Sequence, residues 1–195
     1  FNRLNTDSYF KLGRKVALFG DGHQFRDRRF DTQGWVIPIM GGEFYLTRRF
    51  GFSDGVMGGN LWFMATSEEN AIDAAERAVE AVNQCDDTVL TFPGGIAASA
   101  SKAGSRYSFL IASTYAEFCP SLKAKLGQQS RVPDGVTSIM EIVINGSSLK
   151  AVAHATYMAI DAALAAPGLV KISAGNYGGR LGKSFIHLHR NRQGE

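Results

Sequence analysis

Two stretches of the chain repeat one pattern, and this repeat limits the possible folds more than any other feature of the sequence. Residues 60–92 and residues 138–173 each read as an apolar strand, an amphipathic helix and a second apolar strand. Two βαβ units in a domain of this size predict an α+β fold, the ferredoxin-like split βαβ plait, with an antiparallel sheet and both helices on one face. A doubly wound parallel sheet is the alternative, but it would need more alternating helices than the sequence contains.

In the first copy we expect a strand over residues 60–66, a helix that begins after Ser67, and a strand over residues 88–92. The Ser67 hydroxyl can cap the helix by accepting from a free backbone N–H. Glu68 and Glu69 suit the positive end of the helix dipole. The apolar face of this helix is expected to contain Ile72, Ala75, Val79 and Val82.

In the second copy we expect a strand over residues 138–144, a helix capped by Ser147, and a strand over residues 169–173. Pro167 and Gly168 should end the helix, because proline cannot continue it and glycine tolerates the stop. The apolar face of this helix is expected to contain Leu149, Val152, Ile160 and Ala163.

The first part of the chain lacks this pattern. Residues 1–57 contain short β segments, at 15–19, 35–40 and 43–47, joined by Gly and Asp turns. We therefore expect a β-rich N-terminal arm, followed by the plait over residues 58–195.

Composition excludes several classes of partner. A formal net charge of +3 is too weak to indicate nucleic acid. No apolar run approaches the roughly 18 residues of a membrane span, and no signal peptide opens the chain. Cys85 and Cys119 have no CxxC spacing around them, which favours free thiols and a cytoplasmic location. The first residue is Phe1 rather than Met, so we expect further sequence before it.

Glu141 is the strongest candidate for acid–base chemistry. Nearly all of its neighbours in residues 139–144 are apolar. Burial disfavours the charge of a carboxylate, so a buried glutamate can serve as an acid or base near neutral pH. The alternative is a glutamate on a partly solvated sheet face, paired with an arginine.

The segment of residues 92–105 combines small residues, hydroxyls and Lys102. Backbone N–H groups in such a loop can surround an anion, and lysine adds a charge. The P-loop spacing is absent, and an ordinary connection is the alternative interpretation. Glycine-rich turns at residues 20–22 and 58–60 have the same two interpretations. His187 and His189 flank Leu188 in an expected strand, so both should face the same side. They have no obvious third ligand nearby, so we expect no metal site.

Taken together, the motifs resemble those of the formylmethanofuran–tetrahydromethanopterin formyltransferases. The matching blocks follow one another along nearly the whole chain, at residues 18–24, 58–60, 92–95, 98–105, 112–114, 119–120, 141–146, 171–179 and 187–189. Members of that family carry a further N-terminal α+β lobe. The resemblance implies that residues 1–57 are a linking arm, the remnant of that lobe, and that residues 58–195 are the distal lobe.

The resemblance also implies a reaction. A formyl group passes between the amine of formylmethanofuran and N5 of tetrahydromethanopterin, by direct transfer and without a metal or prosthetic group. The acid–base carboxylate of the family falls on Glu141. Both substrates are anionic, which gives Lys102 and some of the arginines a reason to be cationic.

We therefore expect substrate contacts within the matching blocks. The expected residues are Gly20, Asp21, Gln24, Gly59, Asn60, Pro93, Gly94, Gly95, Ser99, Ser101, Lys102, Ser105, Ser113, Thr114, Asn176 and Tyr177.

The resemblance implies an assembly of several chains. The partners are expected to be copies of this chain, as a tetramer, or the other subunits of a formyltransferase/hydrolase complex. The alternative function is a non-catalytic, ferredoxin-like ligand-binding or scaffold module.

Overall fold

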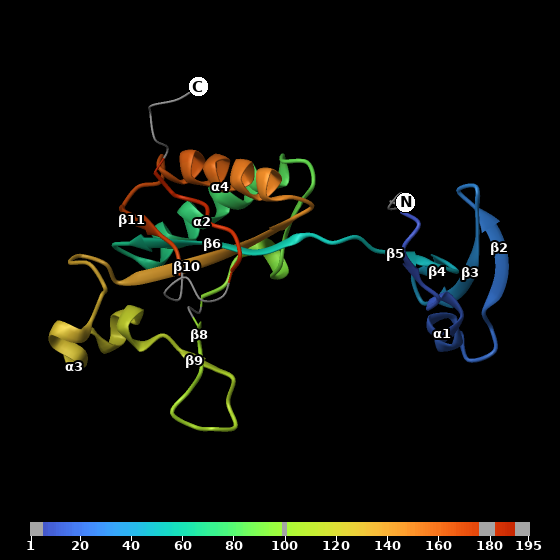
Figure 1. Ribbon diagram of the computed structural model, residues 1–195, viewed down its shortest axis with the longest axis horizontal. Helices are drawn as coiled ribbons and strands as arrows, with labels where there is room; N and C mark the ends of the chain where they lie inside the picture. The colour runs from blue at the N-terminus through green and yellow to red at the C-terminus, as the bar shows by residue number, and fades with distance from the viewer. Residues whose placement is uncertain (1–5, 99–100, 176–181, 190–195) are drawn as a thin grey trace. The chain divides into compact units, whose positions relative to one another are not determined.

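The computed structural model describes residues 6–98, 101–175 and 182–189 of the chain (Figure 1). These residues belong to two compact units, the first ending at Asp54 and the second beginning at Gly55. Each unit has its own sheet, so we describe them separately and refer to them as unit 1 and unit 2.

Unit 1 is built around a three-stranded antiparallel sheet in the order β2-β3-β4. Two short strands, β1 and β5, pair with each other, and a short helix α1 leads into a 3₁₀ turn, η1. The bounds are β1 Tyr9–Phe10, α1 Gly13–Ala17, η1 Leu18–Gly20, β2 Phe25–Arg29, β3 Thr32–Ile39, β4 Gly42–Thr47 and β5 Phe50–Gly51.

The prediction of a strand at residues 15–19 is wrong, because the chain there forms α1 and η1. Gly13 and Ala17, four residues apart, are the buried positions of α1, and this spacing suits a helix. Apolar runs this short do not distinguish a helix from a strand in sequence. Strands β3 and β4 confirm the other two β segments, whereas β2 was not expected.

Unit 2 contains a four-stranded sheet in the order β11-β6-β10-β7, in which each neighbouring pair is antiparallel. This arrangement excludes the doubly wound parallel sheet. The two central strands, β6 and β10, place Trp62 opposite Glu141 and Asn60 opposite Val143. The bounds are β6 Val56–Ala65, β7 Thr88–Leu90, β10 Ser138–Gly146 and β11 Leu169–Ser173.

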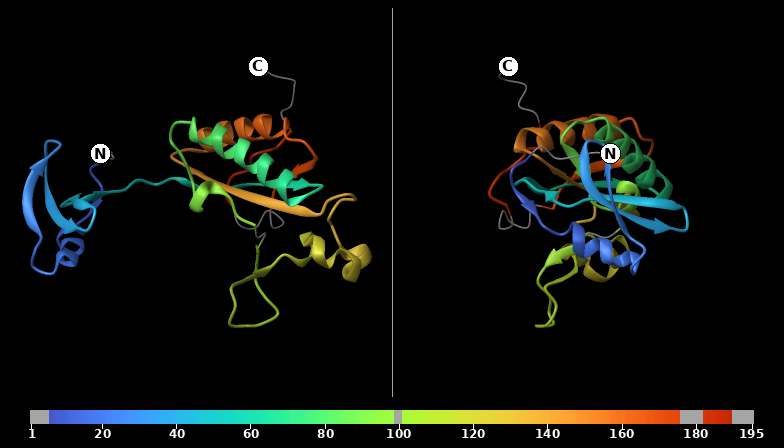
Figure 2. Two further views of the ribbon diagram at one scale, coloured as in Figure 1. Left: turned by 180° about the vertical axis from the view of Figure 1, so that it is seen from behind. Right: turned by 90° about the vertical axis from the view of Figure 1, so that its right-hand side faces the viewer.

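Two helices, α2 (Glu68–Asn83) and α4 (Leu149–Ala163), lie side by side over one face of this sheet (Figures 1 and 2). Their buried residues are mostly alanines, which let the helices approach each other and the sheet closely. The expected apolar faces are partly confirmed, since Val82 and Val152 are fully buried but Leu149 is exposed. Side chains of β6 and β10 that face the helices complete the core: Leu61, Phe63, Ala65, Met140, Ile142 and Ile144.

Serine residues cap both helices. The Ser67 side chain accepts a hydrogen bond from the backbone N–H of Asn70, as expected. The cap of α4 is Ser148, which accepts from Ala151, so the assignment to Ser147 is wrong by one residue. The backbone N–H of Ser147 instead bonds to the carbonyl of Asp87, which places that residue in the turn before the helix.

The opposite face of the sheet is covered by the chain between β7 and β10. This part of the chain contains a small hairpin of β8 and β9, which extends away from the sheet in Figure 1, and several short helical turns. Trp62 and Met64 pack there against Val132 and Val136, with Tyr115 and Phe118 around them. The bounds are η2 Pro93–Gly95, β8 Ser101–Ala103, β9 Ala112–Thr114, η3 Ala116–Phe118, η4 Pro120–Leu122, α3 Lys123–Leu126 and η5 Gly127–Gln129.

Both cysteines, Cys85 and Cys119, are free and half-buried, which confirms that expectation. Burial raises the pKa of both thiols, and the nearby carboxylate of Asp86 adds to the effect at Cys85. No helix in the described part of the chain is long and apolar enough to cross a membrane.

Candidate active site

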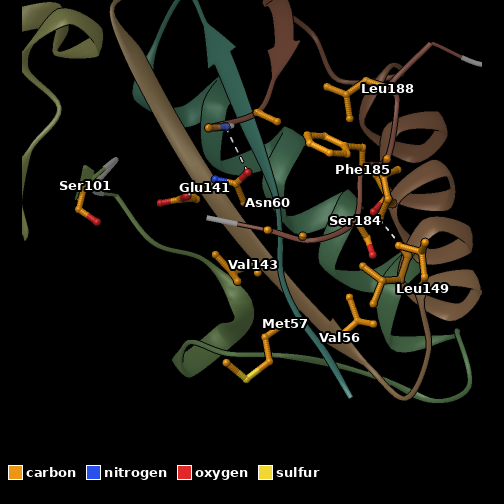
Figure 3. A pocket seen from close by; sticks show the side chains of 18 of the residues that line it. Val56, Met57, Asn60, Ser101, Glu141, Val143, Leu149, Ser184, Phe185 and Leu188 are labelled. Atoms are coloured by element: carbon orange, nitrogen blue, oxygen red, sulfur yellow. Dashed lines mark hydrogen bonds between the residues drawn. The ribbon is translucent and has the colours of Figure 1, made fainter. Parts of the chain in front are cut away.

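A pocket of about 470 Å³ lies in unit 2, along the part of β6 that β11 does not pair with. Its volume falls in the range usual for small-molecule sites. The walls come from β6, β10, α4 and the segment of residues 182–188 (Figure 3). Its apolar lining residues include Val56, Phe92, Val143, Val152, Phe185 and Leu188.

Glu141 lines this pocket and is the only lining residue, among those the structure describes, with an ionisable side chain. It is 7% exposed. Its Oε1 accepts hydrogen bonds from Asn60 Nδ2 at 2.9 Å and from Trp62 Nε1 at 3.0 Å. The carboxylate is therefore held by two neutral donors rather than by the arginine of the alternative interpretation.

The alternation of β10 explains why a carboxylate is placed here. Met140, Ile142 and Ile144 face the helices, so Glu141 and Val143 face the other side of the sheet. Figure 3 shows Glu141 and Asn60 next to each other on neighbouring strands, with Ser101 beyond Glu141. Trp62, which bonds to Glu141, belongs to the aromatic cluster on this face.

Trp62 is the contributor to the site that the sequence analysis missed. Asn60 and Trp62 are two residues apart in a strand, so their side chains share one face. That spacing is visible in the sequence. The spacing indicates a contact with Glu141 only when the register of β6 against β10 is known, because that register places Trp62 directly opposite Glu141.

Of the expected substrate-binding residues, Gly59, Asn60 and Ser101 line the pocket together with Glu141. The structure therefore brings together residues from three separate blocks of the sequence. Their binding roles remain predictions.

The glycine-rich turn of residues 93–95 serves a structural purpose in unit 2. Gly94 and Gly95 have φ of +67° and +81°, which favour glycine. A Cβ on Gly95 would lie 2.8 Å from Val79 Cγ2 and 2.9 Å from Leu90 Cδ1. The turn directs the chain along β10, and none of its residues, Pro93, Gly94 and Gly95, lines the pocket.

The residues expected in the β8–β9 hairpin pair with one another. Lys102 is opposite Ser113 and Ser101 is opposite Thr114. Ser113 donates to the carbonyl of Gly104, and Ser105 accepts from the N–H of Tyr107. Lys102 is exposed, and of these strand residues only Ser101 is among the described residues that line the pocket.

Gly20, Asp21 and Gln24 belong to unit 1, where they form a turn. Asp21 has φ of +49°, and Gln24 Oε1 accepts from the N–H of Gly22. The remaining expected contacts, Ser99, Asn176 and Tyr177, lie outside the described residues.

Arg29 of unit 1 is engaged with two carboxylates. Arg29 bonds to Asp27 at 2.8 Å and to Glu43 at 2.7 Å. The hydrogen bond from Arg29 lowers the pKa of the Asp27 carboxyl, with help from the backbone N–H of Arg28. These contacts fit a solvated, ion-paired surface.

The expected strand at residues 187–189 does not form, and both His187 and His189 are exposed. The carbonyl of His187 accepts a hydrogen bond from the Tyr157 hydroxyl, which ties this segment to α4. Within residues 6–98, 101–175 and 182–189, no three His, Cys, Asp or Glu side chains are grouped as metal ligands would be.

An oriented carboxylate in a largely apolar pocket can accept a proton from one bound group and donate it to another. Acid–base groups act best when their geometry is fixed relative to the proton they move. The arrangement around Glu141 meets that requirement.

Comparison with known proteins identifies the family of this chain. Residues 42–191 match the family model described as "FTR, proximal lobe", whereas we expected residues 58–195 to be the distal lobe. The chain is 46% identical over 180 residues to the formylmethanofuran–tetrahydromethanopterin formyltransferase of Methanopyrus kandleri. The chain belongs to this formyltransferase family. The match covers 92% of the chain and 59% of that relative.

Another formyltransferase of the same name, from Methanothermus fervidus, is 44% identical over 186 residues, which are 95% of this chain and 62% of the relative. The chain therefore spans about three fifths of the length of these members of the family.

Two solved structures resemble the fold of the chain. The formyltransferase from Methanosarcina barkeri has a TM-score of 0.78 at 38% identity, over 92% of this chain and 61% of that one. A chain of the formyltransferase/hydrolase complex from Methylorubrum extorquens, solved with methylofuran, has a TM-score of 0.77 at 37% identity, over 95% and 62%. Both likenesses agree with an α+β fold built on antiparallel sheets.

Proposed function

We propose that this chain carries the acid–base site of an enzyme that transfers a formyl group between the amine of formylmethanofuran and N5 of tetrahydromethanopterin. One observation supports this best: in a member of the formyltransferase family, Glu141 is buried at the wall of a pocket and held by two donors. A buried carboxylate with fixed geometry suits the proton transfers that acyl exchange between two amines requires.

The proposed reaction is direct. The N5 lone pair attacks the formyl carbon and a C–N bond forms, which gives a tetrahedral intermediate. Glu141 accepts the proton from N5 and donates it to the methanofuran nitrogen. The bond between that nitrogen and the formyl carbon then breaks. One proton and one formyl group exchange places, no atom changes oxidation state, and both coenzymes are substrates.

The expected substrate-binding residues remain part of the proposal. Gly59 and Ser101 are the best placed of them to contact a substrate, because they share the pocket with Glu141. Asn60 also lines the pocket, but its amide is bonded to Glu141 on one side and to the N–H of Gly175 on the other. Lys102 follows Ser101 in β8 and is exposed, so we assign it to an anionic part of a substrate that extends beyond the pocket.

The replacement Glu141→Gln tests the mechanism. The amide keeps the size of the side chain but cannot take up the proton. We expect kcat to fall by about 10²–10⁴-fold, the usual contribution of a general acid–base group. The matched control is Glu76→Gln, at an exposed position of α2, which should keep kcat.

The measurements are formyl transfer between the two purified coenzymes and their binding by calorimetry, made on the protein at its full encoded length. Circular dichroism checks the fold of each variant. A Glu141→Gln enzyme with near wild-type kcat would refute the role of Glu141. Binding of the coenzymes without turnover by the wild type would instead favour the non-catalytic module.

We also propose that the chain acts in the cytoplasm beside other subunits, either as a homotetramer or within a formyltransferase/hydrolase complex. Support comes from the β8–β9 hairpin, whose loop exposes Phe109 (79%) and Ile111 (92%), and from the assembly named for the Methylorubrum extorquens relative. Light scattering on the full-length protein provides the test. An active, monodisperse monomer would contradict this part of the proposal.

We infer further that unit 2 is a ferredoxin-like split βαβ plait and that residues 1–57 are a linking arm from a preceding lobe. The strand order β11-β6-β10-β7, with α2 and α4 as the two crossovers, supports the first inference. The partial coverage of the relatives supports the second.

A further inference from the structure

Both donors to the Glu141 carboxylate reach the same oxygen. Asn60 Nδ2 lies 2.9 Å and Trp62 Nε1 lies 3.0 Å from Oε1. The donors belong to one strand, on the face that Glu141 also occupies across the β6–β10 ladder. Two hydrogen bonds to one oxygen fix the rotation of the carboxylate and occupy that oxygen.

Trp62 cannot easily move away from this bond. Its side chain is 1% exposed. Its ring makes edge-on contacts with Phe118 at 4.7 Å and with Tyr115 at 5.9 Å between centroids. Packing of this kind restricts the indole to one orientation, so the N–H remains directed at Glu141.

Asn60 is held from its other end as well. Its Oδ1 accepts a hydrogen bond from the backbone N–H of Gly175 at 3.1 Å. Because the oxygen faces an N–H donor, the amide presents its nitrogen to Glu141. Figure 3 shows the dashed bond to Asn60 and the adjacent Glu141.

The chain just after β11 passes very close to both donors. A Cβ on Gly175 would lie 2.6 Å from Trp62 Cζ2 and 3.1 Å from Asn60 Nδ2. Only glycine allows the backbone to approach so closely. The chain after β11 therefore holds Asn60 and Trp62 in place, and these two donors hold the carboxylate of Glu141.

We propose that Asn60 and Trp62 are positioning residues for the acid–base step. They occupy Oε1 of Glu141, so that Oε2 accepts the proton from the attacking amine and returns it to the leaving amine. The bond from Gly175 makes the position of β11 part of the same arrangement. This inference rests on the proposed function, but its first test does not require activity.

The first test is structural and uses the indole N–H signals in a ¹H–¹⁵N NMR spectrum. The signal of Trp62 is assigned by its loss in Trp62→Phe. An indole that donates to a carboxylate resonates downfield, so Glu141→Gln should move this signal upfield, and Asn60→Ala should shift it slightly. Trp35→Phe identifies the signal of Trp35, which should stay in place in both variants. If the Trp62 signal does not respond to Glu141→Gln, the proposal fails whether or not formyl transfer occurs.

The second test is kinetic and uses Asn60→Asp and Trp62→Phe in the full-length enzyme. Asn60→Asp keeps the acceptor for Gly175 but replaces the N–H donor by a second carboxyl group, which repels Glu141 or shares a proton with it. Trp62→Phe keeps an aromatic ring and loses the N–H. We expect kcat to fall by about 10- to 100-fold in each, the size of effect that a misplaced reacting group produces, with KM nearly unchanged. Asn83→Ala, at an exposed position on α2, is the control and should retain activity.

A double-variant cycle distinguishes loss of positioning from a general loss of structure around the site. If the two residues act through Glu141, adding either replacement to Glu141→Gln should cause little further loss. An equal loss in both backgrounds would show a merely structural role and overturn the proposal. A raised KM with unchanged kcat in Asn60→Asp would identify Asn60 as a substrate contact instead, which also overturns its positioning role.

Discussion

Ala97 and Glu141 exchange both of their backbone hydrogen bonds, each at 2.8 Å. This isolated antiparallel bridge lies on the same edge of β10 as β7. Strand β7 pairs with residues 144–146 at the end of β10, and the bridge forms at Glu141, nearer its start. It anchors the glycine-rich segment at the residue whose side chain enters the pocket. The positions of Ala97 and of Glu141 are therefore linked through the backbone.

The bridge predicts the effect of Ala97→Pro. Proline has no N–H to donate to the Glu141 carbonyl, and its ring does not suit a paired strand. We expect the free energy of unfolding to fall by about 1–3 kcal/mol, the cost of leaving a buried acceptor unpaired. Chemical denaturation measures it, with Ala97→Ser as the control that keeps the N–H. Equal stability of the two variants would contradict the structural role of the bridge.

Gly95→Ala should be more destabilising than Gly94→Ala. Both glycines have positive φ, but a Cβ at 95 meets Val79 and Leu90 whereas one at 94 meets nothing within 4 Å. We expect about 1–2 kcal/mol at 94 from the left-handed backbone and a further 1–3 kcal/mol or so at 95 from overpacking. Thermal unfolding of the two variants compares these costs. A smaller loss at 95 than at 94 would show that the core there is loosely packed.

The two adjacent serines before α4 should respond differently to replacement by alanine. Ser148→Ala removes the side-chain acceptor for Ala151 and should cost about 1 kcal/mol. Ser147→Ala keeps the backbone bond to Asp87 and should cost little. Denaturation midpoints provide the measurement. The opposite ranking would restore the cap to Ser147.

The two thiols should react slowly in the folded protein. Burial raises the pKa of Cys85 and of Cys119, so less thiolate is present at a given pH than in a free cysteine. Alkylation by iodoacetamide near pH 8 should be slower than in denaturant and should accelerate as the pH rises further. Mass spectrometry after timed quenching gives both rates. Equal rates in the folded and denatured protein would contradict the burial of the thiols.

Chelators should leave formyl transfer unchanged if the reaction is the direct exchange proposed above. The measurement is activity after dialysis against a strong chelator, combined with elemental analysis of the purified protein. Stoichiometric zinc that is lost together with His187→Ala and His189→Ala would show that these exposed histidines bind metal.

Local periodicity explains how much of the fold was predictable. The strand at residues 169–173 and the helix that begins after Ser67 were placed correctly, because their apolar pattern and cap are contained in a few adjacent residues. The sequence of helix α1 also fits a strand, because the helix is shorter than two turns and its apolar residues suit either period.

The site was predictable only in part, because it depends on pairing between distant segments. Glu141 stood out as a single charge in an apolar strand. Its partners could not be identified from sequence, since Asn60 and Trp62 are separated from it by 81 and 79 positions. Their contact follows from the register of β6 against β10, which no local pattern specifies.

That register has a consequence for how the family can change over evolutionary time. Side chains alternate along β10, so an insertion or deletion of one residue just before Glu141, with the preceding pairing kept, would turn Glu141 toward the helices and Ile142 toward the pocket side. Such a change would remove the carboxylate and damage the core in one event. Length variation in lineages that retain this site should therefore fall in the connections outside β6 and β10, such as the β8–β9 loop, and not within the two strands.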